Sequence, residues 1–228
     1  MLSPWGKFVY YFSKYLFIAA GKIFFRLSYE GTENVPRRGG VILAANHCSN
    51  FDPPVVGIGI PRYVFFLVKT ELFGRGFLRS YFQLLHEIEV ARGRQGSSAL
   101  GEAEHRIKKG HVVMIFPEGT RSYDGKLLKG RSGVSLLALR TGCPVVPAAV
   151  IGTHLAFPKG KWRLRFVKLT VRFGKPLTFP PFNEGDRIPR EALDNATFQI
   201  MSAIEALLPE AQRLTAEQRT EYYGVSGA

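Results

Sequence analysis

The run Asn46–Asp52, NHCSNFD, places a histidine five residues before an aspartate. An imidazole that donates one ring N–H to a carboxylate keeps its other nitrogen free to accept a proton, as in the base half of a catalytic triad. In a regular helix His47 and Asp52 would lie about 140° apart, so the pair needs a loop. We expect that loop after the apolar strand Val41–Ala45, with Asp52 as the N-cap of a helix opening at Pro53. A plain helix cap beside a hydrogen-bonded histidine fits the motif equally well.

A second motif, FPEGTRS at Phe116–Ser122, again follows an apolar strand candidate, His111–Ile115. Glu118 offers an acceptor for substrate hydroxyls, and Arg121 offers planar donors for a phosphate. Gly119 lets the backbone approach a ligand closely, and amides near it could face an oxyanion. The alternative is a polar β-turn with a surface arginine.

Composition limits the class of protein. The 228 residues suit one domain, and a hydrophobic content of 46% excludes a disordered polyelectrolyte. The net charge of +13, with 31 Lys and Arg against 18 Asp and Glu, calls for an anionic partner. Nucleic acid, an anionic membrane surface and a phosphorylated substrate all meet that requirement.

The cysteines and histidines add two expectations. With only Cys48 and Cys143 present, a reducing compartment is favoured over a disulfide framework. Cys48, beside His47, is an alternative nucleophile. The other histidines show no metal-ligand spacing, so no metal site is expected. They are His86, His105, His111 and His154.

Residues 5–25 are crowded with aromatic side chains, but Lys7, Lys14, Lys22 and Arg26 interrupt every window that could span a membrane. On a helix these cations share one sector roughly 120° wide, which is typical of a helix lying in the membrane interface with its lysines at the headgroups. Packing of this helix on the protein's own core and a tilted single span are the alternatives. The pattern predicts a monotopic protein associated with the cytoplasmic face of a membrane.

Beyond Gly31, apolar β-type runs alternate with helical patterns, which predicts an α/β fold with a mixed, largely parallel sheet flanked by helices. We expect an N-terminal membrane-interface segment, residues 1–29, and one catalytic domain, residues 30–228. The expected strands are 41–45, 63–68, 87–90, 112–116 and 145–151, and the expected helices begin near 53, 75, 97, 134 and 193.

Two stretches near the C-terminus have less regular patterns. From Trp162 to Phe173 apolar and basic residues alternate with a change of phase near Val167, which predicts a strand with a bulge or turn and a solvated basic face. The tail after Pro209 is polar and is expected to end in a frayed segment.

The two motifs in this order resemble the glycerolipid acyltransferases, in particular the 1-acylglycerol-3-phosphate acyltransferases, over about residues 31–176. The resemblance implies acyl transfer from acyl-CoA or acyl carrier protein to the sn-2 hydroxyl of 1-acyl-glycerol-3-phosphate, giving phosphatidic acid. It implies lysophosphatidic acid, the acyl donor and anionic lipids as partners, no nucleic acid, and no bound cofactor.

The resemblance also implies roles for single residues. His47 would be the general base and Asp52 its orienter. Arg92, in a segment Ile88–Arg92 that resembles the family's intermediate arginine motif, would be a second phosphate ligand. The expected substrate contacts are Ser49, Arg92, Glu118, Gly119, Thr120, Arg121 and Lys129.

Two rival functions follow from the same residues. The acceptor could be another lysolipid, a lysophospholipid or a lyso-aminolipid. A non-catalytic module that binds anionic membranes or nucleic acid would explain the charge, but not the pair of motifs.

Overall fold

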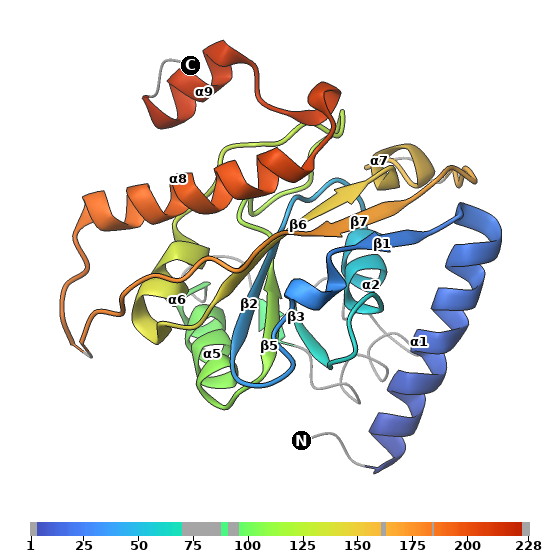
Figure 1. Ribbon diagram of the computed structural model, residues 1–228, viewed down its shortest axis with the longest axis horizontal. Helices are drawn as coiled ribbons and strands as arrows, with labels where there is room; N and C mark the ends of the chain where they lie inside the picture. The colour runs from blue at the N-terminus through green and yellow to red at the C-terminus, as the bar shows by residue number, and fades with distance from the viewer. Residues whose placement is uncertain (1–3, 70–87, 91–95, 161–162, 184, 225–228) are drawn as a thin grey trace.

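The computed structural model describes residues 4–69, 88–90, 96–160, 163–183 and 185–224. These residues form a seven-stranded sheet with helices on both faces (Figure 1). The strands are β1 Ser28–Glu30, β2 Val41–Ala45, β3 Val64–Lys69, β4 Ile88–Val90, β5 Val112–Ile115, β6 Val145–Ile151 and β7 Thr170–Phe173. The helices are α1 Pro4–Phe25, α2 Asp52–Gly57, α5 Gly96–Lys108, α6 Gly133–Thr141, α7 Thr153–Ala156, α8 Arg190–Leu207 and α9 Ala216–Tyr223, with 3-10 turns at Thr32–Asn34 and Glu210–Gln212.

The strand order is β1-β7-β6-β2-β5-β3-β4. Strands β2 to β6 run parallel to one another, and β7 pairs with β6 in the antiparallel sense. The prediction of an α/β fold with a mixed, largely parallel sheet is therefore confirmed. The predicted helix at 75–85 lies outside the described residues.

Strand β2 lies at the centre of the sheet, and all five of its residues are buried. Its side chains alternate between two cores, as a strand covered on both faces requires. Ile42 and Ala44 pack with residues of α5, α6 and α8, whereas Leu43 packs with residues of α2. This burial fixes the end of β2, from which the His47 loop departs.

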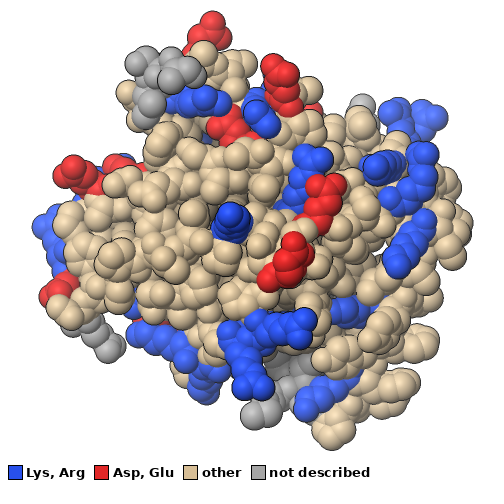
Figure 2. All heavy atoms as spheres, viewed as in Figure 1, with Lys and Arg blue, Asp and Glu red and all other residues tan. Residues whose placement is uncertain are grey.

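One prediction for the C-terminal half was wrong. Residues 163–169 carry no strand, and Leu164 and Phe166 lie exposed, because only β7 finds a neighbour in the sheet. Lys and Arg gather along the edge of the molecule where this segment meets the end of α1 (Figure 2). The tail after Pro209 has structure where it is described: α9 begins with a capping box from Thr215 and Gln218, and Leu214 is buried. Residues 225–228 lie outside the described residues, so the expected frayed end stays a prediction.

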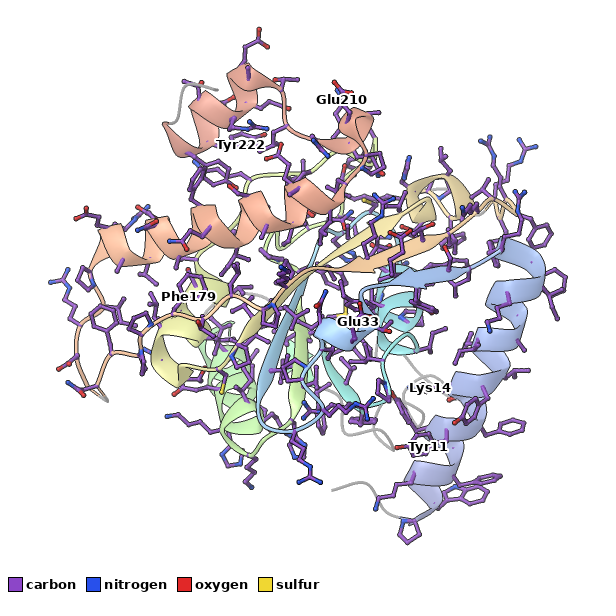
Figure 3. All side chains as sticks on the ribbon, in the orientation of Figure 1. Tyr11, Lys14, Glu33, Phe179, Glu210 and Tyr222 are labelled. Carbon is purple, nitrogen blue, oxygen red and sulfur yellow. The ribbon has the colours of Figure 1, made fainter. Side chains whose placement is uncertain are left out.

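Helix α1 packs one stripe on the domain and exposes the rest. Tyr10 lies against Tyr63 with ring centroids 4.5 Å apart, and the Lys14 ammonium donates to the Ile60 carbonyl. Lys14 is 6% exposed and lies on the side of α1 that faces the domain (Figure 3). The expectation that all the lysines reach headgroups is therefore wrong for Lys14. Among the described residues, α1 is the helix that is long and apolar enough to cross a membrane.

Candidate active site

Both sequence motifs leave the same edge of the sheet. Strands β2 and β5 are parallel neighbours, with Ala44 in register with Ile115. The loop that follows β2 therefore meets the loop that follows β5 at their carboxyl ends, where open α/β sheets bind ligands. Burial of both strands on both faces leaves these loops little freedom of position.

The His47 imidazole is oriented by Asp52. Nδ1 lies 2.8 Å from Asp52 Oδ2. Because an ionised carboxylate only accepts hydrogen bonds, Nδ1 carries the proton and Nε2 has the free lone pair. The ring also stacks on Phe116, with centroids 3.8 Å apart and 13° between the planes. His47 is thus held in the tautomer and orientation of a general base.

Asp52 itself is fully buried, and its Oδ2 has three donors. Besides His47, the backbone amides of Cys48 and Ser49 donate to it at 2.6 and 2.7 Å. Phe51 precedes the helix as N-cap, and Asp52 is its first residue, so the predicted N-cap role was wrong. The carboxylate closes the loop before the helix instead. Its Oδ1 is buried and has no partner in the described part of the chain.

The second motif holds the main chain of His47 from both sides. The His47 amide donates to Glu118 Oε1 at 2.7 Å, and the Ser122 amide donates to the His47 carbonyl at 2.8 Å. Glu118 Oε2 accepts from the Leu128 amide at 3.2 Å. Glu118 therefore links three segments of loop, and its predicted contact with a substrate hydroxyl stays a prediction.

Burial raises the pKa of Glu118 to about 8, against the opposing effect of its two amide donors. The folded state then binds more protons than the unfolded state between about pH 4.5 and pH 8. Stability contributed by this carboxyl is fully present below that window and declines as the pH rises through it.

Glu118→Ala should lower the free energy of unfolding by about 1–3 kcal/mol for each amide left without a partner. The loss should be larger at pH 5 than at pH 8, as measured by urea unfolding. Glu102→Ala is the control, because Glu102 pairs with Arg106 one turn further along α5, an i,i+4 interaction whose contribution is about 0.5 kcal/mol. Equal losses in the two variants would contradict the linking role.

The remaining predicted residues differ in their exposure. Gly119, Thr120 and Lys129 are exposed and Arg121 is half-buried near the His47 loop. Within the described residues the Arg121 guanidinium has no hydrogen-bond or ion-pair partner, so it is available to a ligand. Ser49 is fully buried, and its hydroxyl donates to the Phe157 carbonyl at 2.7 Å. Arg92 lies outside the described residues.

The turn at Gly119 has φ 66°, a conformation that favours glycine. Its amide donates to the Phe116 carbonyl at 3.0 Å. An oxyanion donor in this turn would therefore have to be another amide.

Cys48 is a buried residue of the core. It is 1% exposed, and burial, together with the nearby carboxylates of Asp52 and Glu118, raises the pKa of its thiol. A protonated, buried thiol is a poor nucleophile. The alternative of a cysteine nucleophile is thus disfavoured by the geometry.

Sequence reasoning missed two supports of the site. The Asn46 side chain accepts from the Val150 amide at 2.7 Å and donates to the Val150 carbonyl at 3.1 Å, which joins the start of the loop to β6. The C-terminal segment holds the loop after the second motif, because the Tyr223 hydroxyl accepts from the Gly130 amide at 3.1 Å. The contact of Asn46 with β6 could have been suspected, because Asn46 is a polar residue directly after a buried strand. The contact of Tyr223 with Gly130 had no signal in the sequence.

Comparisons with known proteins cover both motifs. The model of the family described as Acyltransferase matches residues 26–151. A 1-acyl-sn-glycerol-3-phosphate acyltransferase of Limnanthes douglasii is 34% identical over 69% of this chain and 54% of its own length. One of Bacillus subtilis is 33% identical over 58% of this chain and 67% of its own length. The chain thus spans about half the length of the Limnanthes relative.

A solved structure has the same fold. The crystal structure of the 1-acyl-sn-glycerophosphate (LPA) acyltransferase from Thermotoga maritima superposes with a TM-score of 0.71 at 28% identity. The match covers 89% of this chain and 80% of that one.

Proposed function

Because this chain belongs to the acyltransferase family, we propose that it transfers a fatty acyl group from a thioester to the sn-2 hydroxyl of 1-acyl-glycerol-3-phosphate. The donor would be acyl-CoA or acyl-acyl carrier protein, and the product phosphatidic acid. The observation that carries the proposal is the His47–Asp52 pair, 2.8 Å apart, with Nε2 of the ring left to accept a proton. The names of the similar proteins support the choice of acceptor.

In the proposed mechanism, His47 Nε2 removes the hydroxyl proton as the oxygen attacks the thioester carbonyl. The buried Asp52 carboxylate stabilises the imidazolium that forms. Collapse of the tetrahedral intermediate breaks the C–S bond, and the imidazolium returns its proton to the departing thiolate. The acceptor supplies the nucleophile, so the reaction needs no acyl-enzyme.

The phosphate of the acceptor would be bound by Arg121, next in the chain to Ser122, whose amide holds the His47 carbonyl. A guanidinium is suited to a phosphate because its planar donors match the phosphate oxygens in pairs. Arg92 would be the second ligand. Two arginines favour a phosphomonoester, with its charge of about −1.5 to −2, over the singly charged phosphodiester of other lysophospholipids.

Arg121→Ala should raise the KM for the acceptor about 10- to 100-fold and change kcat less, because a charge-assisted hydrogen bond is worth about 1.5–3 kcal/mol. Steady-state kinetics at a fixed donor concentration would measure this. Arg187→Ala removes an exposed arginine from the loop before α8 and should leave KM unchanged. A normal acceptor KM in Arg121→Ala would rule out the phosphate contact.

We further propose that α1 lies in the plane of the cytoplasmic membrane interface. One stripe of α1 is fixed to the domain through Tyr10 and Lys14, while its other faces expose large apolar side chains. A helix packed in this way suits an in-plane orientation better than a span surrounded by lipid. The assignment of residues 1–29 as a membrane segment rests on this argument.

An acceptor panel tests the function. Purified protein with acyl-CoA should release thiol fastest with lysophosphatidic acid, and more slowly with lysophosphatidylglycerol, lysophosphatidylcholine or a lyso-aminolipid. Preference for one of the others would favour the rival acceptor. DNA binding without thiol release on any lysolipid would favour the non-catalytic module.

A further inference from the structure

Residues 163–168, RLRFVK, form a largely exposed segment without helix or strand between α7 and β7. Arg163, Arg165 and Lys168 alternate with apolar residues. Leu164 is 45% exposed and Phe166 is 62% exposed, even though both are large and apolar. A segment with a merely solvated basic face would be expected to turn these two side chains inward, so their exposure calls for an explanation.

The segment is continuous with the end of α1. The Phe166 ring lies 5.4 Å from Phe24 and 5.5 Å from Phe25, centroid to centroid. Just beyond the segment, the Leu169 amide donates to the Phe25 carbonyl at 3.0 Å. Residues 22–26 and 163–168 therefore make one surface, here named the docking rim.

The rim is both cationic and apolar. Lys22 and Arg26 add exposed cations to those of the segment, and the sequence has no Asp or Glu between Asp124 and Glu184. Lys and Arg are seen together at this edge of the molecule (Figure 2). Along α1 the apolar surface continues through further exposed side chains, which are Trp5, Phe8, Tyr11, Phe12, Tyr15, Leu16, Phe17 and Ile23.

We propose that the docking rim is a second membrane-contact element, which binds the surface of an anionic lipid bilayer beside α1. Cations attract the headgroups of acidic lipids, and Leu164 and Phe166 enter the boundary between headgroups and acyl chains. An acidic protein partner would account for the cations but not for the exposed apolar side chains. The bilayer is favoured because the exposed apolar side chains interleave with the cations and run on into the apolar faces of α1.

The rim is linked to the catalytic loop through aromatic contacts. Phe25 lies edge-on to Phe51, with centroids 6.1 Å apart, and Phe51 stacks on Phe157 at 5.0 Å. The Phe157 carbonyl accepts from Ser49 in the His47–Asp52 loop. Seating of the rim would therefore set the position of this loop relative to the bilayer that carries the acceptor. This proposal rests on the proposed function only in that both require a bilayer as the partner of the chain.

The test is binding of the full chain to vesicles without substrates, measured by co-sedimentation. On vesicles of phosphatidylcholine with 30% phosphatidylglycerol, Arg163→Gln/Arg165→Gln should weaken binding about 25-fold, because the loss of each cation weakens binding about fivefold. Phe166→Ala should weaken binding about tenfold. On pure phosphatidylcholine the double variant should bind like the wild type, whereas Phe166→Ala should still be weaker.

Two further variants control for net charge and for folding. Lys175→Gln/Arg187→Gln removes the same charge from exposed sites outside the rim and should change binding less than threefold. Arg163→Lys/Arg165→Lys keeps the charge and should retain binding. Thermal unfolding temperatures should agree among all variants, since each altered side chain is exposed.

The proposal is overturned if the rim and control double variants bind anionic vesicles equally well. It is also overturned if the rim variant binds vesicles normally but loses binding to an acidic acyl carrier protein, which would assign the rim to that partner. Vesicle binding is measured without turnover, so this test is independent of the proposed function. A chain that bound vesicles through the rim but failed to transfer acyl groups would contradict the proposed function and leave this inference intact.

Discussion

His47→Ala should lower kcat about 10²- to 10⁴-fold, the usual contribution of a positioned general base. The acceptor KM should change little, because the imidazole acts on the hydroxyl proton in the transition state. The fold should persist, since Asp52 keeps the amides of Cys48 and Ser49 as donors. Steady-state thiol release with lysophosphatidic acid measures the effect.

The matched control for this variant is His105→Ala, which removes an exposed histidine on α5. It should retain wild-type kcat. A purified, folded His47→Ala protein with full activity would end the general-base mechanism.

Asp52→Asn should also lower kcat about 10²- to 10⁴-fold. All three donors of the carboxylate meet at Oδ2, so an amide oxygen in that place can keep the loop closed. The amide lacks the negative charge that stabilises the imidazolium. Its NH2 group would occupy the place of Oδ1, which is buried without a partner in the described residues, so some loss of stability is also expected.

Asp194→Asn controls for the loss of a carboxylate, because Asp194 is exposed and pairs only with Arg190 among the described residues. Circular dichroism and urea unfolding would separate instability from lost catalysis. Should folded Asp52→Asn keep its kcat, Asp52 would be a structural residue rather than the orienter of His47.

Sequence reasoning predicted the centre of the fold well because the signals there are local. Strand β2 was predicted with its observed bounds, since five consecutive apolar residues follow a glycine pair and end at a polar residue. The His47 and Glu118 motifs each follow a buried strand, and parallel neighbours bring their ends together. The proximity of the two motifs was therefore readable from the sequence.

The failures have a different origin, in contacts between segments distant in the chain. The alternation at residues 163–168 has strand periodicity, but this segment packs against α1 rather than pairing with the sheet. Lys14 lies on the cationic sector of α1, yet its ammonium donates a hydrogen bond to the Ile60 carbonyl inside the interface with the domain. Glu118 has the chemistry of a substrate ligand, and only its two amide donors disclose the internal role. Periodicity and residue type do not contain such information.

The central claim, direct transfer to a hydroxyl activated by His47, is tested by mixing an acyl thioester with excess protein in a single turnover. We expect no thiol release until lysophosphatidic acid is added, then one phosphatidic acid for each thiol, with both products formed about 10²- to 10⁴-fold more slowly by His47→Ala. Release of thiol before the acceptor is present, with the acyl group retained on the protein, would contradict it.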